Sequence, residues 1–139
     1  MRSLAAVLAA LWAGSLTTIC AVVAPTLFAT LADRRLAGET AGHFFHLASL
    51  IGLAIGAVLL ILVLARRLRL PARWGSTLIV VTAGLPLLSQ LALGPAMRGA
   101  QAAGDMSRFG LLHGVSAILF FAACIGAIVL VVLVSRPAE

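Results

Sequence analysis

Charged residues divide this chain into long apolar segments. Four segments contain no Asp, Glu, Lys or Arg: residues 3–32, 40–65, 74–97 and 109–135. Each is longer than the roughly 20 residues that an α-helix needs to cross about 30 Å of hydrocarbon. The pattern therefore predicts four transmembrane helices, over residues 4–32, 42–65, 74–93 and 109–135.

The same segments lack the alternation of apolar and polar positions that is typical of barrel strands. Because a backbone in lipid must satisfy its own hydrogen bonds, only helices or a closed barrel can span a membrane. The predicted fold class is therefore all-α, with one integral membrane domain over residues 1–139 built as a four-helix bundle. Val22-Val23-Ala24 resembles a signal-peptide cleavage site. However, Pro25 follows it and the apolar run is too long for a signal peptide, so we interpret the segment as the first transmembrane helix.

Composition supports the membrane and explains the charge. Hydrophobic residues make up 63% of the chain and charged residues only 10%, whereas a soluble domain has about 25% charged residues. The net charge is +6, and all ten basic residues are Arg. They lie at helix ends rather than on one basic face, so they indicate membrane topology and not nucleic-acid binding.

The positive-inside rule gives an orientation. The Arg residues predicted on one side of the membrane are Arg2, Arg66, Arg67, Arg69, Arg73 and Arg136. Those predicted on the other side are Arg34, Arg35, Arg98 and Arg108. Because Arg-rich loops stay in the cytoplasm, we expect both termini there, in a bacterial inner membrane.

The two halves of the chain resemble each other. The segment "WAGSLTTICAVVAPTLF" from Trp12 resembles "WGSTLIVVTAGLPLLSQ" from Trp74, and both run from Trp to Pro. The segments that begin at His46 and His113 share HxxS at the start and Arg at the end. This repetition predicts two tandem helical hairpins related by a pseudo-two-fold axis along the membrane normal, with the two histidines at similar depth.

Proline occupies matching positions in the first and third predicted helices under this alignment, at Pro25 and Pro86. Each proline frees the carbonyl oxygen four residues earlier, on Ala21 or Thr82. Two interpretations stay open. The prolines either produce packing kinks, or they build a polar cavity in which a hydroxyl such as that of Thr26 meets the freed oxygens.

Small residues recur every four positions on two predicted helices, at Ala48, Gly52 and Gly56 and again at Gly110 and Gly114. Such stripes let helix backbones approach closely in lipid. We therefore expect them to be packing seams, within the chain or with a second copy or another membrane protein.

The two cysteines are predicted to be separate. Counted from the cytoplasmic boundary, Cys20 lies 18 residues beyond Arg2 and Cys124 lies 12 residues before Arg136. At about 1.5 Å per residue their depths differ by roughly 9 Å, which is beyond disulfide reach unless a helix shifts. We expect both to act as small apolar packing residues.

Polar side chains gather near the predicted extracytoplasmic ends of the helices. The candidate residues for a ligand or polar cluster are His43, His46, His113, Gln90, Ser49, Ser116, Pro25 and Thr26. Met97 and Met106 lie in the connection that follows, which is predicted to be a flexible loop. Imidazole and thioether groups are ligands for copper or haem, so His46 and His113, with His43 as an alternative, form a candidate metal site.

Two other interpretations of these histidines stay open. Helix ends lie in the wet interface, where a histidine costs little and needs no ligand. The histidines also fit a proton or substrate path. Catalysis has less support: GxSxG, HExxH and phosphate-loop motifs do not occur, and His113 with Ser116 lacks an orienting acid.

Several short motifs resemble the transmembrane-protein-205-like family. They are Trp12 and Gly14, then Ala24-Pro25-Thr26-Leu27-Phe28, then Gln90 with Leu93-Gly94-Pro95, and finally Phe109, Leu112, His113 and Ser116. Ser89 and Phe120 stand where that family often has Tyr and Asn. The resemblance implies a four-helix integral membrane protein and brings no established activity.

These patterns together predict a non-enzymatic membrane protein. Its expected role is that of a scaffold, or of a module that handles a small ligand or ion at the extracytoplasmic end of the bundle. The alternative is a haem- or copper-binding redox or homeostasis protein that uses His46 and His113.

Overall fold

The computed structural model describes residues 1–68 and 70–136, and over these residues it is all-helical. The first span consists of α1 (Arg2–Thr18), the π-helix η1 (Ile19–Val23) and α2 (Ala24–Thr30). The second span is α3 (Arg34–Leu64). The third consists of α4 (Ala72–Leu88), the π-helix η2 (Ser89–Leu93) and α5 (Gly94–Ala102), and the fourth is α6 (Met106–Ser135).

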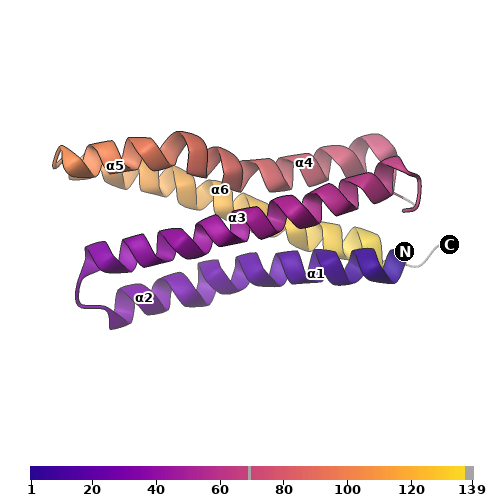
Figure 1. Cartoon of the computed structure of the whole chain (residues 1–139), viewed down its shortest axis with the longest axis horizontal. Helices are drawn as coiled ribbons and strands as arrows, with labels where there is room; N and C mark the ends of the chain where they lie inside the picture. Colours follow the sequence, from indigo (N-terminus) through magenta and orange to yellow (C-terminus); the bar gives the residue numbers. More distant parts are fainter. Residues whose placement is uncertain (69, 137–139) are drawn as a thin grey trace.

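Each of the four spans is long and apolar enough to cross a membrane, which confirms the predicted fold class. The chain crosses the bundle four times in alternating directions, so the start of α1, the end of α3, the start of α4 and the end of α6 lie at one end (Figure 1). The turns after α2 and α5 lie at the other end (Figure 1). Helices α3 and α6 each pack against α1 and α4, which gives a ring-like bundle.

All four spans begin earlier than their charge-free segments, and the third also ends later. The α3 helix begins at Arg34, not at residue 42, because Asp33 caps it by accepting hydrogen bonds from Arg35 N and Leu36 N. The third span continues to Ala102, not to residue 93. The expected flexible loop is therefore mostly helix, since Pro95 occupies the first turn of α5, where its missing N–H costs nothing.

The two halves of the chain repeat the same order of elements. In each half a 17-residue α-helix leads into a five-residue π-helix, and a short helix with proline in its first turn follows. An Asp residue then caps a long helix. The tandem hairpins are therefore present, but their register differs from the prediction: Pro25 corresponds to Pro95 and not to Pro86.

The π-helices explain how the first span passes Pro25 and how the third passes Pro95, whereas Pro86 lies inside the α-helix α4. Proline has no N–H, and its ring clashes with the carbonyl group four residues earlier in an α-helix. Just before Pro25, Ala24 N donates to Ile19 O, and just before Pro95, Gly94 N donates to the oxygen of the residue five positions earlier, Ser89. This wider turn carries the helix past the proline without a break.

Large side chains lie over glycines at two helix contacts in the core. Trp12 of α1 is 1% exposed, and a methyl group added at Gly52 of α3 would lie 2.5 Å from its Nε1 atom. Likewise, a methyl group at Gly126 of α6 would overlap the Oγ1 atom of Thr82 of α4. These contacts fix the spacing of the helices in both halves of the bundle.

Of the two predicted small-residue seams, one packs against other helices of this chain and the other does not. Ala48, Gly52 and Gly56 are buried against neighbouring helices, which confirms the seam on α3. Gly110 and Gly114 on α6 are exposed, and a methyl group added at either would meet open space. The second stripe is therefore not a seam within this chain, because the start of α6 turns that face outward.

Large apolar side chains cover the outside of the bundle. Ile61, Leu91 and Ile118, on three different spans, are between 64% and 69% exposed. An apolar surface of this extent needs lipid or a protein partner in contact with it. The exterior therefore fits a membrane as the solvent.

Candidate polar site at the outer end

The long helices are longer than a bilayer is thick. The α3 helix has 31 residues and α6 has 30. At about 1.5 Å per residue each is about 45 Å long, which exceeds the hydrocarbon by about 15 Å. On α3 the charged residues lie in the first turns, far from the chain termini, so the excess length projects at that end. We call this part, residues 31–46 and 94–113, the outer end.

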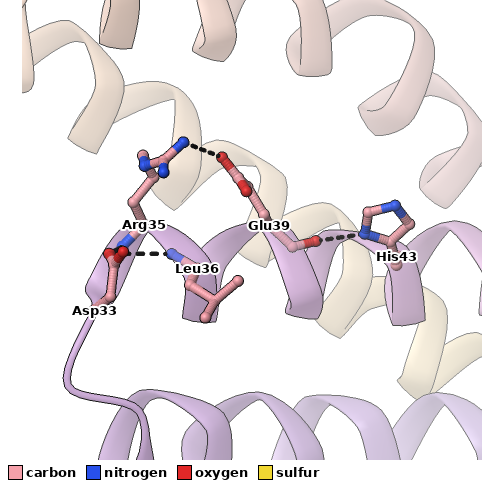
Figure 2. Close-up of polar contacts among 5 residues, drawn as sticks. All are labelled: Asp33, Arg35, Leu36, Glu39 and His43. Carbon is pink, nitrogen blue, oxygen red and sulfur yellow. Dashed lines mark hydrogen bonds and ion pairs between the residues drawn. The ribbon is translucent and has the colours of Figure 1, made fainter.

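A chain of polar contacts orders the start of α3 (Figure 2). Asp33 Oδ1 accepts from Arg35 N at 2.8 Å and from Leu36 N at 3.2 Å. Arg35 Nη1 lies 3.1 Å from Glu39 Oε1, one helical turn further on. His43 Nδ1 lies 2.8 Å from the backbone oxygen of Glu39. An exposed ion pair of this kind contributes only about 0–1 kcal/mol, so the capping residue is the stronger element.

The contact to the backbone oxygen of Glu39 decides which ring nitrogen of His43 carries a proton. A carbonyl oxygen only accepts hydrogen bonds, so Nδ1 of His43 carries the proton and donates it. In the neutral ring Nε2 is then the nitrogen with the free lone pair. A backbone oxygen that holds one ring nitrogen leaves the other available for a ligand, as in many metal-binding histidines.

All three histidines are exposed. The ring of His113 stacks on Phe109, one turn earlier on α6, with centroids 6.0 Å apart and an interplanar angle of 11°. Counted from the capping residues Asp33 and Asp105, His113 lies five residues nearer the helix start than His46 does. This difference is about 7.5 Å measured along the helix axes. The similar depth of the two histidines in the bundle stays a prediction.

Between α3 and α6 the bundle holds an aromatic pair. The rings of Phe45 and Phe120 lie 4.6 Å apart at an interplanar angle of 58°. Phe45 directly precedes His46, whose side chain is exposed. Within the described residues, no three His, Cys, Asp or Glu side chains are placed to hold a metal ion together. A metal role for the histidines stays a prediction.

A buried polar contact joins the third and fourth spans. Ser89 Oγ of η2 lies 2.6 Å from Ser116 Oγ of α6, and Ser89 is 2% exposed. The sequence grouped Ser116 and Ser49 with the histidines in one candidate polar cluster. Ser116 bonds to Ser89 instead, and Ser49 Oγ donates to the backbone oxygen of Phe45.

Sequence reasoning missed Ser89 as part of the site. It lies beside Gln90, which is partly exposed, in an otherwise apolar stretch. A serine in the middle of a membrane span needs an acceptor, and this is the signal that could have identified it.

The candidates on the first span lie apart from this contact. Pro25 and Thr26 are exposed on α2. Thr30 Oγ1 donates to the backbone oxygen of Thr26 at 2.7 Å, so the hydroxyl groups here satisfy their own helix. The polar residues predicted as one constellation are therefore divided between an exposed set and a buried contact.

The cysteines are close together, contrary to the sequence-based prediction. Cys20 Sγ of η1 lies 3.8 Å from Cys124 Sγ of α6. Counting residues from the membrane boundary treats the helices as parallel, whereas α6 crosses the bundle obliquely, from beside α5 to beside α1 (Figure 1). Because α6 is oblique, Cys124 lies close to Cys20 despite the difference in residue count.

Comparison with known proteins identifies the family but not an activity. The family described as "Domain of unknown function (DUF4149)" matches residues 7–106, which is most of the chain. The chain belongs to this family. In this DUF4149 protein the match extends from α1 to the first residue of α6. Searches of curated proteins and of solved structures each gave no match.

Proposed function

We propose that this DUF4149 protein is a non-enzymatic membrane scaffold that presents its outer end to a partner protein. The observation that carries the proposal is the length of the helices: α3 and α6 are each about 15 Å longer than the hydrocarbon is thick. The projecting part carries the capped and charged start of α3 and its histidines. We place it on the extracytoplasmic side of a bacterial inner membrane, with both termini in the cytoplasm.

The packing below the outer end supports a static role. Trp12 lies over Gly52, and Thr82 lies over Gly126, so the helices meet with their backbones close together. Close-packed contacts of this kind give a single arrangement rather than several. A rigid bundle holds the projecting helix ends at fixed distances, which a binding surface requires.

Cross-linking in native membranes tests the scaffold. A photoreactive amino acid at Leu36, which is 48% exposed at the outer end, is expected to form a discrete protein adduct. The matched control is Ile61, which is 64% exposed on the same helix but lies within the hydrocarbon. We expect lipid adducts alone at Ile61. The proposal fails if Leu36 gives no protein adduct, or if both positions give the same one.

A second candidate is a haem- or copper-binding protein that uses His46 and His113, with His43 as an alternative ligand. The observation that favours it is the outward-facing Nε2 of His43, with Nδ1 held by the backbone. This function requires a Soret band or bound copper in the purified protein, lost in His46→Ala and in His113→Ala. The scaffold requires neither.

A resemblance to the transmembrane-protein-205-like family fits both candidates, because it implies the four-helix membrane fold alone. The exposed stripe of Gly110 and Gly114 offers a surface on which a helix of a second copy or of another membrane protein can pack closely. Assembly through this stripe is part of the scaffold proposal.

A further inference from the structure

The two cysteines form a pair inside the bundle. Cys20 and Cys124 are the only cysteines of the chain, and their Sγ atoms lie 3.8 Å apart. Cys124 is buried, with 6% of its surface exposed, and Cys20 is partly exposed. Both lie within spans that are apolar enough to cross a membrane.

The distance between the sulfur atoms is close to what a disulfide needs. A disulfide has an S–S bond of about 2.05 Å, so each sulfur atom has to move by about 1 Å from its present position. Rotation about the Cα–Cβ bond of each residue changes the position of its sulfur atom. Cys20 also lies in the π-helix η1, where the backbone is wider than in an α-helix.

We propose that Cys20 and Cys124 are a redox-active dithiol, which a lipid-soluble quinone oxidises to an intramolecular disulfide. The two S–H bonds break and one S–S bond forms. The two electrons and the two protons pass to the quinone, which becomes a quinol. An uncharged dithiol that dissolves in the bilayer reverses the reaction: its two S–H bonds break, its own disulfide forms, and the two electrons and two protons restore the thiols of Cys20 and Cys124.

The location of the pair selects this class of oxidant. Water-soluble oxidants and charged disulfides do not enter the hydrocarbon, in which both cysteines lie. A quinone dissolves in the bilayer and can approach Cys20 from the lipid side, where that residue is partly exposed. A single thiol buried among apolar groups is inert, but here a second sulfur atom lies in contact with the first.

The disulfide would join the first span to the last. The residues that it links are 104 positions apart in the sequence, so the bond would close almost the whole bundle into one covalent loop. In the reduced protein the same two spans are held by packing and by a hydrogen bond from Arg2 Nη2 to the backbone oxygen of Ser135. The inference is independent of the proposed scaffold function, because it concerns the interior of the bundle and not the outer end.

The test uses the full chain in detergent, reduced, freed of reductant and kept without oxygen. Decylubiquinone is added, and quinol formation, alkylation of thiols and intact mass are measured together. We expect one quinol per chain, loss of both alkylatable thiols, a mass lower by two hydrogen atoms, and a product that stays monomeric. Reductant should restore both thiols.

The matched control is the double variant Cys20→Ser with Val22→Cys. It has the same number of thiols, but position 22 is 57% exposed and lies on the opposite side of the helix from position 20. We expect this variant to keep both thiols under the same conditions. The proposal is overturned if wild-type protein keeps both thiols after exposure to the quinone, or if the control loses its thiols equally fast.

Discussion

Replacing Trp12 with alanine is expected to lower the free energy of unfolding by about 3 kcal/mol. Trp12 is 1% exposed and lies over Gly52 and Gly56, which have no side chains with which to fill the space. Lipid is itself apolar, so an apolar side chain gains little free energy when it is buried in a membrane protein. Most of the cost of Trp12→Ala therefore comes from the cavity and from lost contacts. The value is therefore at the low end of the range for tryptophan in soluble cores.

The second tryptophan provides the control. Trp74 is 79% exposed near the start of α4, so Trp74→Ala should change the stability by less than about 0.5 kcal/mol. Unfolding in mixed micelles of increasing denaturing detergent, followed by circular dichroism, measures both variants. Equal losses for Trp12→Ala and Trp74→Ala would contradict the packing described for α1 and α3.

Replacing Gly126 with alanine is expected to destabilise the bundle by about 1–3 kcal/mol. Alanine is the better helix former, so helix propensity alone favours the substitution. The added methyl group, however, would overlap Thr82 Oγ1 and would lie 3.3 Å from Thr82 Cβ, at the contact between α4 and α6. The two helices must then separate or Thr82 must change rotamer, and both changes cost free energy.

Two further variants separate the overlap from other causes. Thr82→Ala removes the Oγ1 and Cγ2 atoms, so Gly126→Ala should cost much less in that background than in the wild type. Gly114→Ala, on the same helix but in open space, should be neutral or slightly stabilising. An unchanged cost of Gly126→Ala in the Thr82→Ala background would contradict the assigned contact.

The spans themselves could be predicted from the sequence because charge is so costly in lipid. Four long segments contain no Arg, Asp or Glu, and only spanning helices explain this pattern. The ends of the helices could not be read in this way. Outside the hydrocarbon a helix stops where its caps are, and Asp33 extends α3 into a charged region that the apolar pattern treats as a loop.

The candidate site was harder to predict because it depends on how the helices cross. The sequence matched His46 with His113, yet the two lie at different numbers of residues from the capping residues Asp33 and Asp105 of their helices. Depth counting also separated Cys20 from Cys124, whose sulfur atoms are in contact. Crossing angles arise from packing between helices, and no local pattern in the sequence carries them.

The central claim is that lipid surrounds four crossings and that the outer end lies in water on the extracytoplasmic side. Labelling with a maleimide that does not cross membranes tests it, using single cysteines in a chain with Cys20→Ser and Cys124→Ser. Applied to intact cells, the reagent should label Ala103→Cys, between α5 and α6, and should reach Leu70→Cys, between α3 and α4, only after permeabilisation. Labelling of Leu70→Cys in intact cells, with or without Ala103→Cys, would contradict the account.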